Sequence, residues 1–387
     1  MKITVSKEKL LEKLIPAMGT VSNKNTITAI EGVLIETLED NKVRISTYDM
    51  NKGTRAVLEA LDIEEGGSYI INAQRFYQTV RVLPDDDITI EVNENLNCTI
   101  SSGKASFSML SVLGGEEFPN LPDLVTDKGF DIEASLLRKV IGKVIHSVAE
   151  QDPRPFLCGA FFKIEKDEIE VVSCDGYNLS KCNVKCQVNG FEGDGDVNYS
   201  FIVPGHALTE LSKILADCKE DERVNIYISR KHIIVNLPET VFFTRTIDSE
   251  FMDYNRNIPK DNDIFVTVDR ERLLDGLERA NIIAEEKIQG SGKSYVKINV
   301  EEQFLTLTST SLRGKVSDEM DCSHEGENIE IGFNCRYLIN SIKAAEGENI
   351  KISFKSPTRG IVITAEEEDE NYKYLYLILP IRMTDNK

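Results

Sequence analysis

Residues 265–283 read FVTVDRERLLDGLERANII, a short alternating strand followed by a polar break and a helix that begins on a double leucine. The same plan occurs at residues 1–19, MKITVSKEKLLEKLIPAMG, and at residues 130–148, FDIEASLLRKVIGKVIHSV. Leu273 and Leu277 are four residues apart, which places them on one face of a helix, and the other two copies have a similar apolar spacing. Three copies of one strand–helix unit indicate an internally repeated chain.

A second element also occurs three times. It reads YIINAQRFYQTVRVLPDDDITIEV from residue 69, FIVPGHALTELSKILADCKEDERVNIYI from residue 201 and IEIGFNCRYLINSIKAAEGENIKISF from residue 329. Each copy is a strand, a short helix, a turn and a second strand, and the copies recur with a period of about 130 residues. Two independent elements with one period make the triplication a strong signal.

The segments between the helices predict antiparallel sheet. Stretches such as GVLIETLEDNKVRISTYD alternate apolar and polar residues, which is typical of hairpins with one buried face. Proline-containing joints, FPNLPDL at 118–124 and MDYNRNIPKDND at 252–263, separate the copies. We therefore expect three α+β domains, residues 1–124, 125–254 and 255–387, each with two helices packed on antiparallel sheet.

Charge is distributed unevenly along the chain. The 387 residues include 45 Lys and Arg against 65 Asp and Glu, a formal net charge of -20. The predicted helices, 7–18, 74–82, 134–146, 206–218, 270–281 and 335–345, hold 14 of the basic residues and only 7 of the acidic ones. One explanation is that Lys and Arg are good helix formers. The other is that the helices share a positive surface that holds phosphates without reading bases.

No catalytic motif is visible. The sequence contains neither a glycine-rich phosphate loop nor a nucleophile elbow. The acidic runs PDDDIT, with Asp85–Asp87, and EEEDE, Glu366–Glu370, could hold magnesium, but both fall between strands, where acidic residues make ordinary solvated turns. The four histidines lie far apart in sequence and lack recognisable partners. We expect no enzyme activity, no metal and no cofactor.

The cysteines and the apolar runs predict the compartment. The eight cysteines include no Cys-x-x-Cys pair, so we expect buried free thiols in a reduced, cytoplasmic protein. The N-terminus lacks the apolar run of a signal peptide, and no apolar stretch is long enough for a transmembrane helix, so no membrane partner is expected.

Several motifs, taken in order, resemble one family. They are MKITV with LLEKL near the start, FPNLP, QDPRPFLCG, SCDGYNL, FMDYNRNIP, IGFNCRYL and the terminal LPIRM. Together they resemble the bacterial sliding clamps, the beta subunits of DNA polymerase III, over residues 1–383. The resemblance implies the DNA clamp fold and a head-to-tail homodimeric ring, with helices lining a hole that encircles duplex DNA without sequence preference. Such a protein is a non-catalytic processivity factor of a DNA polymerase holoenzyme, and it is associated with the nucleoid.

The resemblance also implies protein partners. These are the replicative polymerase alpha subunit, the clamp loader complex, the 3'-5' exonuclease of the polymerase complex, and repair polymerases, ligase and mismatch-repair proteins. Partners of the family insert short extended peptides into an apolar pocket between the second and third domains. The terminal run YLYLILPIRM, residues 374–383, is expected to close the last sheet, and its end is expected to form one wall of this pocket.

Residue by residue, the resemblance implies three sites. The peptide pocket would include Arg154, Phe156, Leu157, Cys174, Gly176, Tyr177, Leu179, Met252, Arg256, Tyr337, Gly360, Leu377, Leu379, Pro380, Ile381, Arg382 and Met383. DNA would be contacted by Lys24, Arg75, Arg81 and Gln151. In the ring contact, Phe107 and Met109 of one chain would face Ile282 and Ile283 of the other.

Two further interpretations stay open. The chain could be a metal-dependent nucleic-acid hydrolase that uses its acidic turns, or a repeat protein that scaffolds partners without binding DNA. Magnesium-dependent cleavage would favour the hydrolase, and failure to load on DNA would favour the scaffold.

Overall fold

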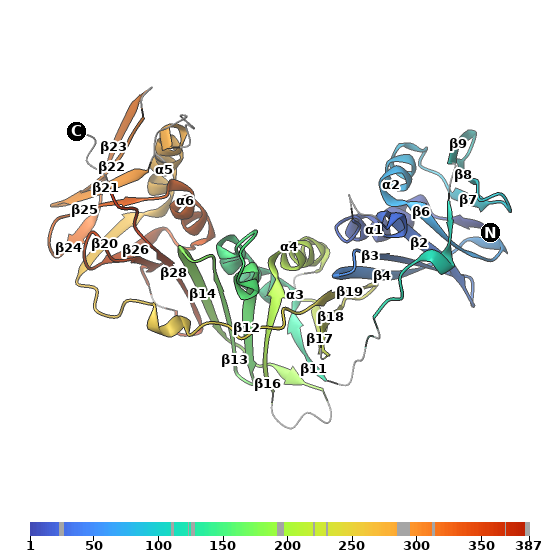
Figure 1. Ribbon diagram of the computed structural model, residues 1–387, viewed down its shortest axis with the longest axis horizontal. Helices are drawn as coiled ribbons and strands as arrows, with labels where there is room; N and C mark the ends of the chain where they lie inside the picture. Colours follow the sequence, from blue (N-terminus) through green and yellow to red (C-terminus); the bar gives the residue numbers. More distant parts are fainter. Residues whose placement is uncertain are drawn as a thin grey trace. The chain divides into compact units, whose positions relative to one another are not determined.

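A computed structural model describes residues 1–22, 27–109, 112–122, 124, 128–191, 197–219, 221–229, 231–284, 295–311, 314–367 and 369–383 (Figure 1). The chain forms two compact units. The N-terminal unit comprises Met1–Arg138, Asn189–Val197 and His206–Thr246, and the C-terminal unit comprises Lys139–Val188, Asn198–Gly205 and Ile247–Lys387.

The N-terminal unit contains two antiparallel sheets, and helix α4, Gly205–Ile214, lies almost wholly in it together with the two helices of its first residues. The five-stranded sheet has the order β5-β1-β7-β8-β9, with β5 Asp62–Glu65, β1 Lys2–Val5, β7 Ile88–Val92, β8 Cys98–Ser102 and β9 Ala105–Met109. The ten-stranded sheet has the order β10-β6-β2-β3-β4-β19-β18-β17-β11-β15, with β10 Leu113–Gly114, β6 Ser68–Asn72, β2 Gly32–Leu38, β3 Lys42–Tyr48, β4 Lys52–Glu59, β19 Thr240–Arg245, β18 His232–Asn236, β17 Arg223–Ile228, β11 Gly129–Glu133 and β15 Asn189–Gly190. Helices α1, Lys7–Met18, and α2, Ala73–Val82, contribute Leu10, Leu14, Phe76 and Val80 to the core that both sheets share.

The C-terminal unit repeats this plan. Its nine-stranded sheet has the order β16-β12-β13-β14-β28-β27-β26-β20-β24, with β16 Asn198–Pro204, β12 Gly159–Glu165, β13 Glu168–Cys174, β14 Asn178–Lys185, β28 Tyr372–Ile378, β27 Ile361–Ala365, β26 Asn349–Phe354, β20 Ile264–Asp269 and β24 Ser323–Glu325. Its four-stranded sheet has the order β23-β22-β21-β25, with β23 Lys315–Asp321, β22 Phe304–Thr310, β21 Val296–Glu301 and β25 Ile329–Phe333. Helices α5, Arg270–Ala284, and α6, Cys335–Ala344, pack in its core.

The predicted helices are confirmed. Besides those four, α3 spans Ala134–Val144 and α4 spans Gly205–Ile214. Both end earlier than predicted, because their last turns tighten into 3-10 helices at Ile145–Ser147 and Leu215–Asp217, as is common at helix ends. The paired strands of the described residues are antiparallel, as the alternating segments predict.

The terminal strand does not close the last sheet, contrary to expectation. Strand β28 lies inside the nine-stranded sheet, beside β14 (Figure 1). Its other neighbour is β27, so that Ile378 is paired with both Asn178 and Ile361. The sheet therefore joins strands from before residue 205 to strands from after residue 260. With neighbours on both sides, the backbone groups of β28 are hydrogen-bonded in the ladder, which explains why so apolar a segment ends the chain without being an exposed edge.

The charge count on the helices overstates the positive surface. Lys143 of α3 is only 5% exposed, and its Nζ lies 2.8 Å from the carboxylate of Glu346 and 4.9 Å from the ring centre of Tyr374. Burial lowers the pKa of Lys143, and Glu346 opposes that shift. Lys13 of α1 is likewise buried and paired, with Glu239. The side chains of these two lysines are therefore buried between neighbouring segments and do not add positive charge to the surface of the helices.

His146 lies next to this buried pair. Its Nε2 is 3.1 Å from Ser180 Oγ, and its ring meets the edge of Tyr376 at 5.2 Å between centres. Its Nδ1 is buried without a hydrogen-bond partner in the described part of the chain. Burial, and secondarily the charge of Lys143, lowers the pKa of His146 to about 4.

This shift predicts a loss of stability in mild acid. In the unfolded chain His146 binds a proton with a pKa of about 6.5, whereas in the folded chain it does so only at about pH 4. The free energy of unfolding that is present above pH 6.5 therefore falls as the pH drops from 6.5 to 4. Between pH 7 and pH 5 the free energy of unfolding should fall in both chains. We expect this fall to be about 2 kcal/mol smaller in His146→Gln than in the native chain. Denaturant titrations at both pH values measure this difference, and the carboxylates shared by both chains cancel. Equal losses would contradict the assignment.

The cysteines and the helices test the predictions of free buried thiols and of no membrane-spanning segment. All eight cysteines are free, as predicted, but only Cys98, Cys174, Cys182 and Cys335 are buried, and the other four are half-buried. Burial raises the pKa of Cys98 and of Cys182 to about 12. Within the described ranges, no helix has both the length and the apolar character needed to cross a membrane.

Candidate functional site

Residues 251–261, which we call the strap, pack on one face of the nine-stranded sheet. That face, the groove face, carries Leu179, Leu377 and Val362, whereas Tyr376 and Ile378 on the alternate positions belong to the core. Phe251, Met252, Tyr254 and Ile258 of the strap pack against the apolar residues of the groove face.

Tyr254 holds the strap to the sheet. Its hydroxyl donates to Glu170 of β13, and Lys181 Nζ lies 2.5 Å from the same carboxylate and 5.2 Å from the centre of the tyrosine ring. Burial alone would raise the pKa of Glu170, but hydrogen bonds from Lys181, Tyr254 and Asn183 outweigh it and lower that pKa. The carboxylate is therefore ionised and fixes the strap at neutral pH.

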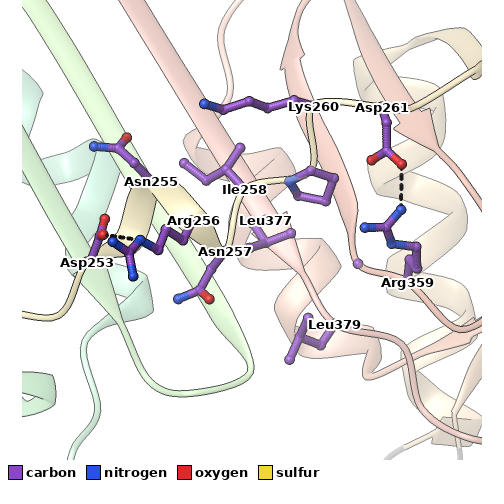
Figure 2. A pocket seen from close by; sticks show the side chains of 12 residues that line it. Asp253, Asn255, Arg256, Asn257, Ile258, Lys260, Asp261, Arg359, Leu377 and Leu379 are labelled. Atoms are coloured by element: carbon purple, nitrogen blue, oxygen red, sulfur yellow. Dashed lines mark hydrogen bonds and ion pairs between the residues drawn. The ribbon is translucent and has the colours of Figure 1, made fainter.

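A cavity of about 620 Å³ opens between the strap and the end of β28 (Figure 2). Its lining consists of Asp253, Asn255, Arg256, Asn257, Ile258, Pro259, Lys260, Asp261, Arg359, Gly360, Leu377 and Leu379. Leu377 is 5% exposed, whereas Leu379 is 41% exposed and stands at the mouth. A side chain at Gly360 would place its Cβ 2.8 Å from Leu377 and 3.0 Å from Leu379, so glycine keeps this space open.

Paired charges form the rim of this cavity. Arg256 lies 2.7 Å from Asp253, and Arg359 lies 2.7 Å from Asp261, as the dashed lines of Figure 2 mark. Both pairs are exposed, so they contribute little to the free energy of unfolding. They present hydrogen-bonding groups around an apolar floor, which suits an extended peptide with apolar side chains and a polar backbone.

The turn between β13 and β14 lies beside the cavity mouth. Asp175 Oδ1 accepts hydrogen bonds from the backbone of Tyr177 and Asn178, and Gly176 has φ +94°, which favours glycine. The backbone N–H of Leu379 donates to the carbonyl of Tyr177 at 2.9 Å. The Tyr177 side chain is 65% exposed. This turn therefore fixes where the chain leaves β28.

Most residues predicted for the peptide pocket come together here. Arg256, Gly360, Leu377 and Leu379 line the cavity. Phe156, Leu157, Cys174, Leu179 and Met252 belong to the apolar cluster beneath it. Arg154, Gly176, Tyr177 and Tyr337 surround the β13–β14 turn, where Tyr337 shares a hydrogen bond with Asp175 and Arg154 holds the pKa of Asp152 down at about 2.

The last predicted residues lead away from the cavity. The backbone N–H of Ile381 donates to the carbonyl of Gly332 on β25, the edge of the four-stranded sheet. Met383 also packs there, because a Cβ at Gly332 would lie 2.9 Å from it. Pro380 is half-buried and Arg382 is exposed. None of these four residues lines the cavity, so their role in peptide binding stays a prediction.

Sequence reasoning missed most of the strap. Of its residues Met252, Arg256 and the pocket position Asn257 were expected at the site, whereas Ile258, Pro259 and Lys260, which line the cavity as well, were not. The signal was the joint at 252–263, which the sequence marks as a connection between copies. A connection that packs across a sheet is well placed to wall a pocket, because pockets occur preferentially where domains meet.

The residues predicted to contact DNA are exposed where the structure describes them. Arg75 and Arg81 lie on α2, and Arg81 stands 5.9 Å from the ring centre of Tyr77. Gln151 follows α3 in the C-terminal unit, and Lys24 lies outside the described residues. Arg75, Arg81, Lys9 and Arg138 have no carboxylate partner within the described ranges, so their charge is available to a ligand.

The residues predicted for the ring contact lie on two different elements. Phe107, 42% exposed, and Met109 are on β9, an outer strand of the five-stranded sheet. Ile282, 72% exposed, and Ile283 are near the end of α5. An apolar helix end and an unpaired strand edge are both features that proteins normally cover.

Three family models match the chain in order. They describe the N-terminal, central and C-terminal domains of the DNA polymerase III beta subunit, and they match residues 1–122, 131–253 and 255–382. The chain belongs to the DNA polymerase III beta subunit family. The three-domain clamp fold that the sequence predicts is thereby confirmed, and the exact domain boundaries stay predictions.

Individual relatives agree with this assignment. The beta sliding clamp of Bacillus subtilis (strain 168) is 29% identical over 392 residues, which cover 99% of this chain and 100% of the relative. A solved structure from Eubacterium rectale, described as a putative DNA polymerase III beta subunit, has a TM-score of 0.88 at 28% identity, with 99% and 100% covered. A sliding clamp from Bartonella birtlesii, solved bound to griselimycin, has a TM-score of 0.87 at 25% identity, with 99% and 100% covered.

Membership of the beta subunit family decides between the open interpretations. A beta subunit is a sliding clamp, a non-catalytic processivity factor, so the expectation that the chain is not an enzyme is confirmed through its family. The metal-dependent hydrolase is not supported. Within the described residues, no three His, Cys, Asp or Glu side chains gather to hold a metal ion, and Asp85 instead lies 2.7 Å from Lys7.

Proposed function

We propose that this sliding clamp works as a head-to-tail homodimer around duplex DNA and tethers the replicative polymerase through the cavity beside the strap. The observation that carries the tethering proposal is the 620 Å³ cavity, which combines the apolar floor of Leu377 with a rim of hydrogen-bonding charges. This combination suits a short extended peptide better than a small polar substrate, because both carboxylates of the lining, Asp253 and Asp261, are already paired with arginines.

The ring proposal rests on two unpaired sheet edges. Strand β9 is an outer strand of the five-stranded sheet, and β23 is an outer strand of the four-stranded sheet. Pairing β9 of one copy with β23 of a second would cover both edges and bring Phe107 and Met109 toward Ile282 and Ile283. When two different surfaces of the same chain bind each other, each copy is rotated relative to the next. The copies form a closed ring if these rotations add up to a full turn.

DNA contacts in such a ring need not be strong. Arg75 and Arg81, with Lys24 and Gln151, are proposed to touch phosphates without reading bases. The acidic body, with a net charge of -20, disfavours tight electrostatic binding, and a ring that encloses DNA does not require it.

The cavity is proposed to serve several partners in turn. They include the polymerase alpha subunit, the clamp loader complex, and repair polymerases, ligase and mismatch-repair proteins. The griselimycin complex of the Bartonella birtlesii clamp supports the view that a clamp of this fold offers a site for ligands other than DNA. The eight free cysteines support work in the reducing cytoplasm, on the nucleoid.

Leu379→Glu tests the tether. The substitution puts a charge at the mouth of the cavity, where an apolar anchor of the peptide would be desolvated, and burial of one aliphatic side chain is worth roughly 1.5–3 kcal/mol. We expect a fluorescent peptide from the polymerase tail to bind at least about tenfold more weakly, since each 1.4 kcal/mol is a factor of ten. Polymerase synthesis on long primed templates should shorten in parallel.

Val57→Glu is the matched control. Val57 is also 41% exposed and lies on β4 of the ten-stranded sheet, so it changes surface charge equally without touching the cavity. Peptide affinity should stay native in this variant. An unchanged affinity in Leu379→Glu, with the fold intact, would place the partner site elsewhere.

A further inference from the structure

A second cavity lies next to the first on the groove face. It has a volume of about 340 Å³, and its lining consists of Lys181, Asn183, Ile258, Thr364, Ala365, Glu367, Asp369, Tyr372, Lys373, Tyr374 and Leu375. Ile258 of the strap lines both cavities, so its side chain lies between them. The volume is at the lower end for ligand pockets and suits one or two side chains rather than a whole ligand.

The two cavities follow the spacing of the strand beneath them. Leu377 lies under the first cavity and Leu375 under the second, and these residues face Leu179 and Lys181 of β14 in the ladder. Positions two apart on a strand point to the same face and are separated by about 6.8 Å. The same distance separates alternate side chains of an extended peptide, so a peptide that fills the first cavity can reach the second two or three residues further along.

The second cavity is suited to an apolar side chain. Leu375 and Ile258 give it apolar lining, and Lys181 is already matched by Glu170 at 2.5 Å. Its other charged lining residues, Glu367, Asp369 and Lys373, are exposed. Beyond it, a hollow of about 420 Å³ is lined by Glu168, Asn183, Lys185, Glu370, Asn371 and Lys373. Asn183 and Lys373 line both, so the groove face changes from apolar to polar at the end of the second cavity that lies away from the first.

We propose that the second cavity takes one further bulky apolar side chain of the same docked peptide, two or three residues from the anchor in the first cavity. Residues still further along the peptide would be polar. The proposal rests on the proposed function, because it assumes that a peptide anchor fills the cavity beside the strap. It adds the second cavity as a determinant of which peptides bind, on the side of Ile258 that faces away from the first cavity.

Thr364→Trp is the test variant. Thr364 is half-buried on β27 and lines the second cavity but not the first, and its neighbour Ile363 belongs to the core. An indole at position 364 fills the second cavity, and aromatic residues are well tolerated in strands. Thr364→Ser, which leaves the space open, is the matched control. Thermal unfolding and sedimentation show that each variant keeps its fold and assembly.

The measurement compares two sets of peptides. One set contains only the polymerase-tail anchors, and the other adds Ala, Leu, Phe or Asp at each of the three positions on either side. On the native chain and on Thr364→Ser, Leu or Phe at one flanking position should tighten binding about five- to tenfold over Ala. Thr364→Trp should remove this gain and leave the affinity of the anchor-only peptide unchanged. The proposal is overturned if no position gains, or if the gain survives in Thr364→Trp.

A second probe separates this proposal from the tether itself. N-acetyl-phenylalaninamide at millimolar concentration is titrated while methyl NMR signals of Leu375, Ile258 and Leu379 are followed. Saturable shifts at Leu375 that vanish in Thr364→Trp support the second cavity even if the anchor-only peptide fails to bind, in which case the proposed tether alone is wrong. No shift at Leu375 would overturn the inference.

Discussion

Dimers loaded on a nicked circular duplex are expected to stay bound at salt concentrations well above physiological, and to leave when the circle is cut. Contacts made by a few cations such as Arg75 and Arg81 weaken steeply with salt, because phosphate binding releases counterions. A closed ring is held by topology instead, so salt has little effect until a DNA end appears. Gel filtration of labelled protein on circular and linearised DNA measures the retained fraction.

Blocked ends provide the control for retention. A linear duplex with a bulky protein bound at each end should retain the ring as a circle does, because sliding off is prevented although the DNA is the same. Equal retention on circular and open linear DNA would contradict encirclement and favour ordinary phosphate contacts. Failure to load on any form would favour the scaffold interpretation.

Ile282→Lys combined with Ile283→Lys is expected to convert the dimer into a folded monomer. Ile282 is 72% exposed in the single chain and Ile283 is half-buried near the helix end, where a long lysine side chain can reach solvent, so the fold should survive both substitutions before assembly. In the proposed contact with Phe107 and Met109 of a second copy, two ammonium groups would be desolvated without partners, which is strongly unfavourable. Sedimentation velocity at micromolar concentration distinguishes the two states, and the same variant should not be retained on circular DNA.

Ile15→Lys is the control for this experiment. Ile15 is 54% exposed on α1, and its replacement adds a lysine to a helix surface outside the proposed contact. That variant should remain dimeric. A dimeric Ile282→Lys, Ile283→Lys protein would show that the interface lies elsewhere, and the pairing of β9 with β23 would then have to be abandoned.

The repeated plan and the helices could be predicted because local signals specify them. Apolar spacing on one helix face predicts that Leu10 and Leu14 are buried, as they are. Asn72 and Asn334 precede two of the helices, and their side chains accept hydrogen bonds from Arg75 and Arg336 backbone groups. Such signals act within a few residues, so they survive in a chain whose copies have diverged.

The candidate site was predicted in part, through motifs rather than through geometry. Arg256, Leu377 and Leu379 were placed at the pocket by resemblance, and they line one cavity. The role of Ile258 in separating two cavities was not predictable, because it depends on the strap crossing the sheet. Nor was the departure of Ile381 toward β25, since it depends on contacts of Ile381 and Met383 with the distant residue Gly332.

The amino-acid sequence by itself showed that the chain is acidic, that its α+β plan occurs three times and which segments form its helices. It could not establish that β28 joins β14, since Leu377 and Leu179 are paired across about two hundred residues and nothing local encodes that register. Nor could it establish which helix cations are buried, because Lys143 and Lys13 look like surface lysines until Glu346 and Glu239 are brought against them. Pairing of strands and burial of charge are decided by contacts between distant segments, and these contacts exist only once the chain has folded.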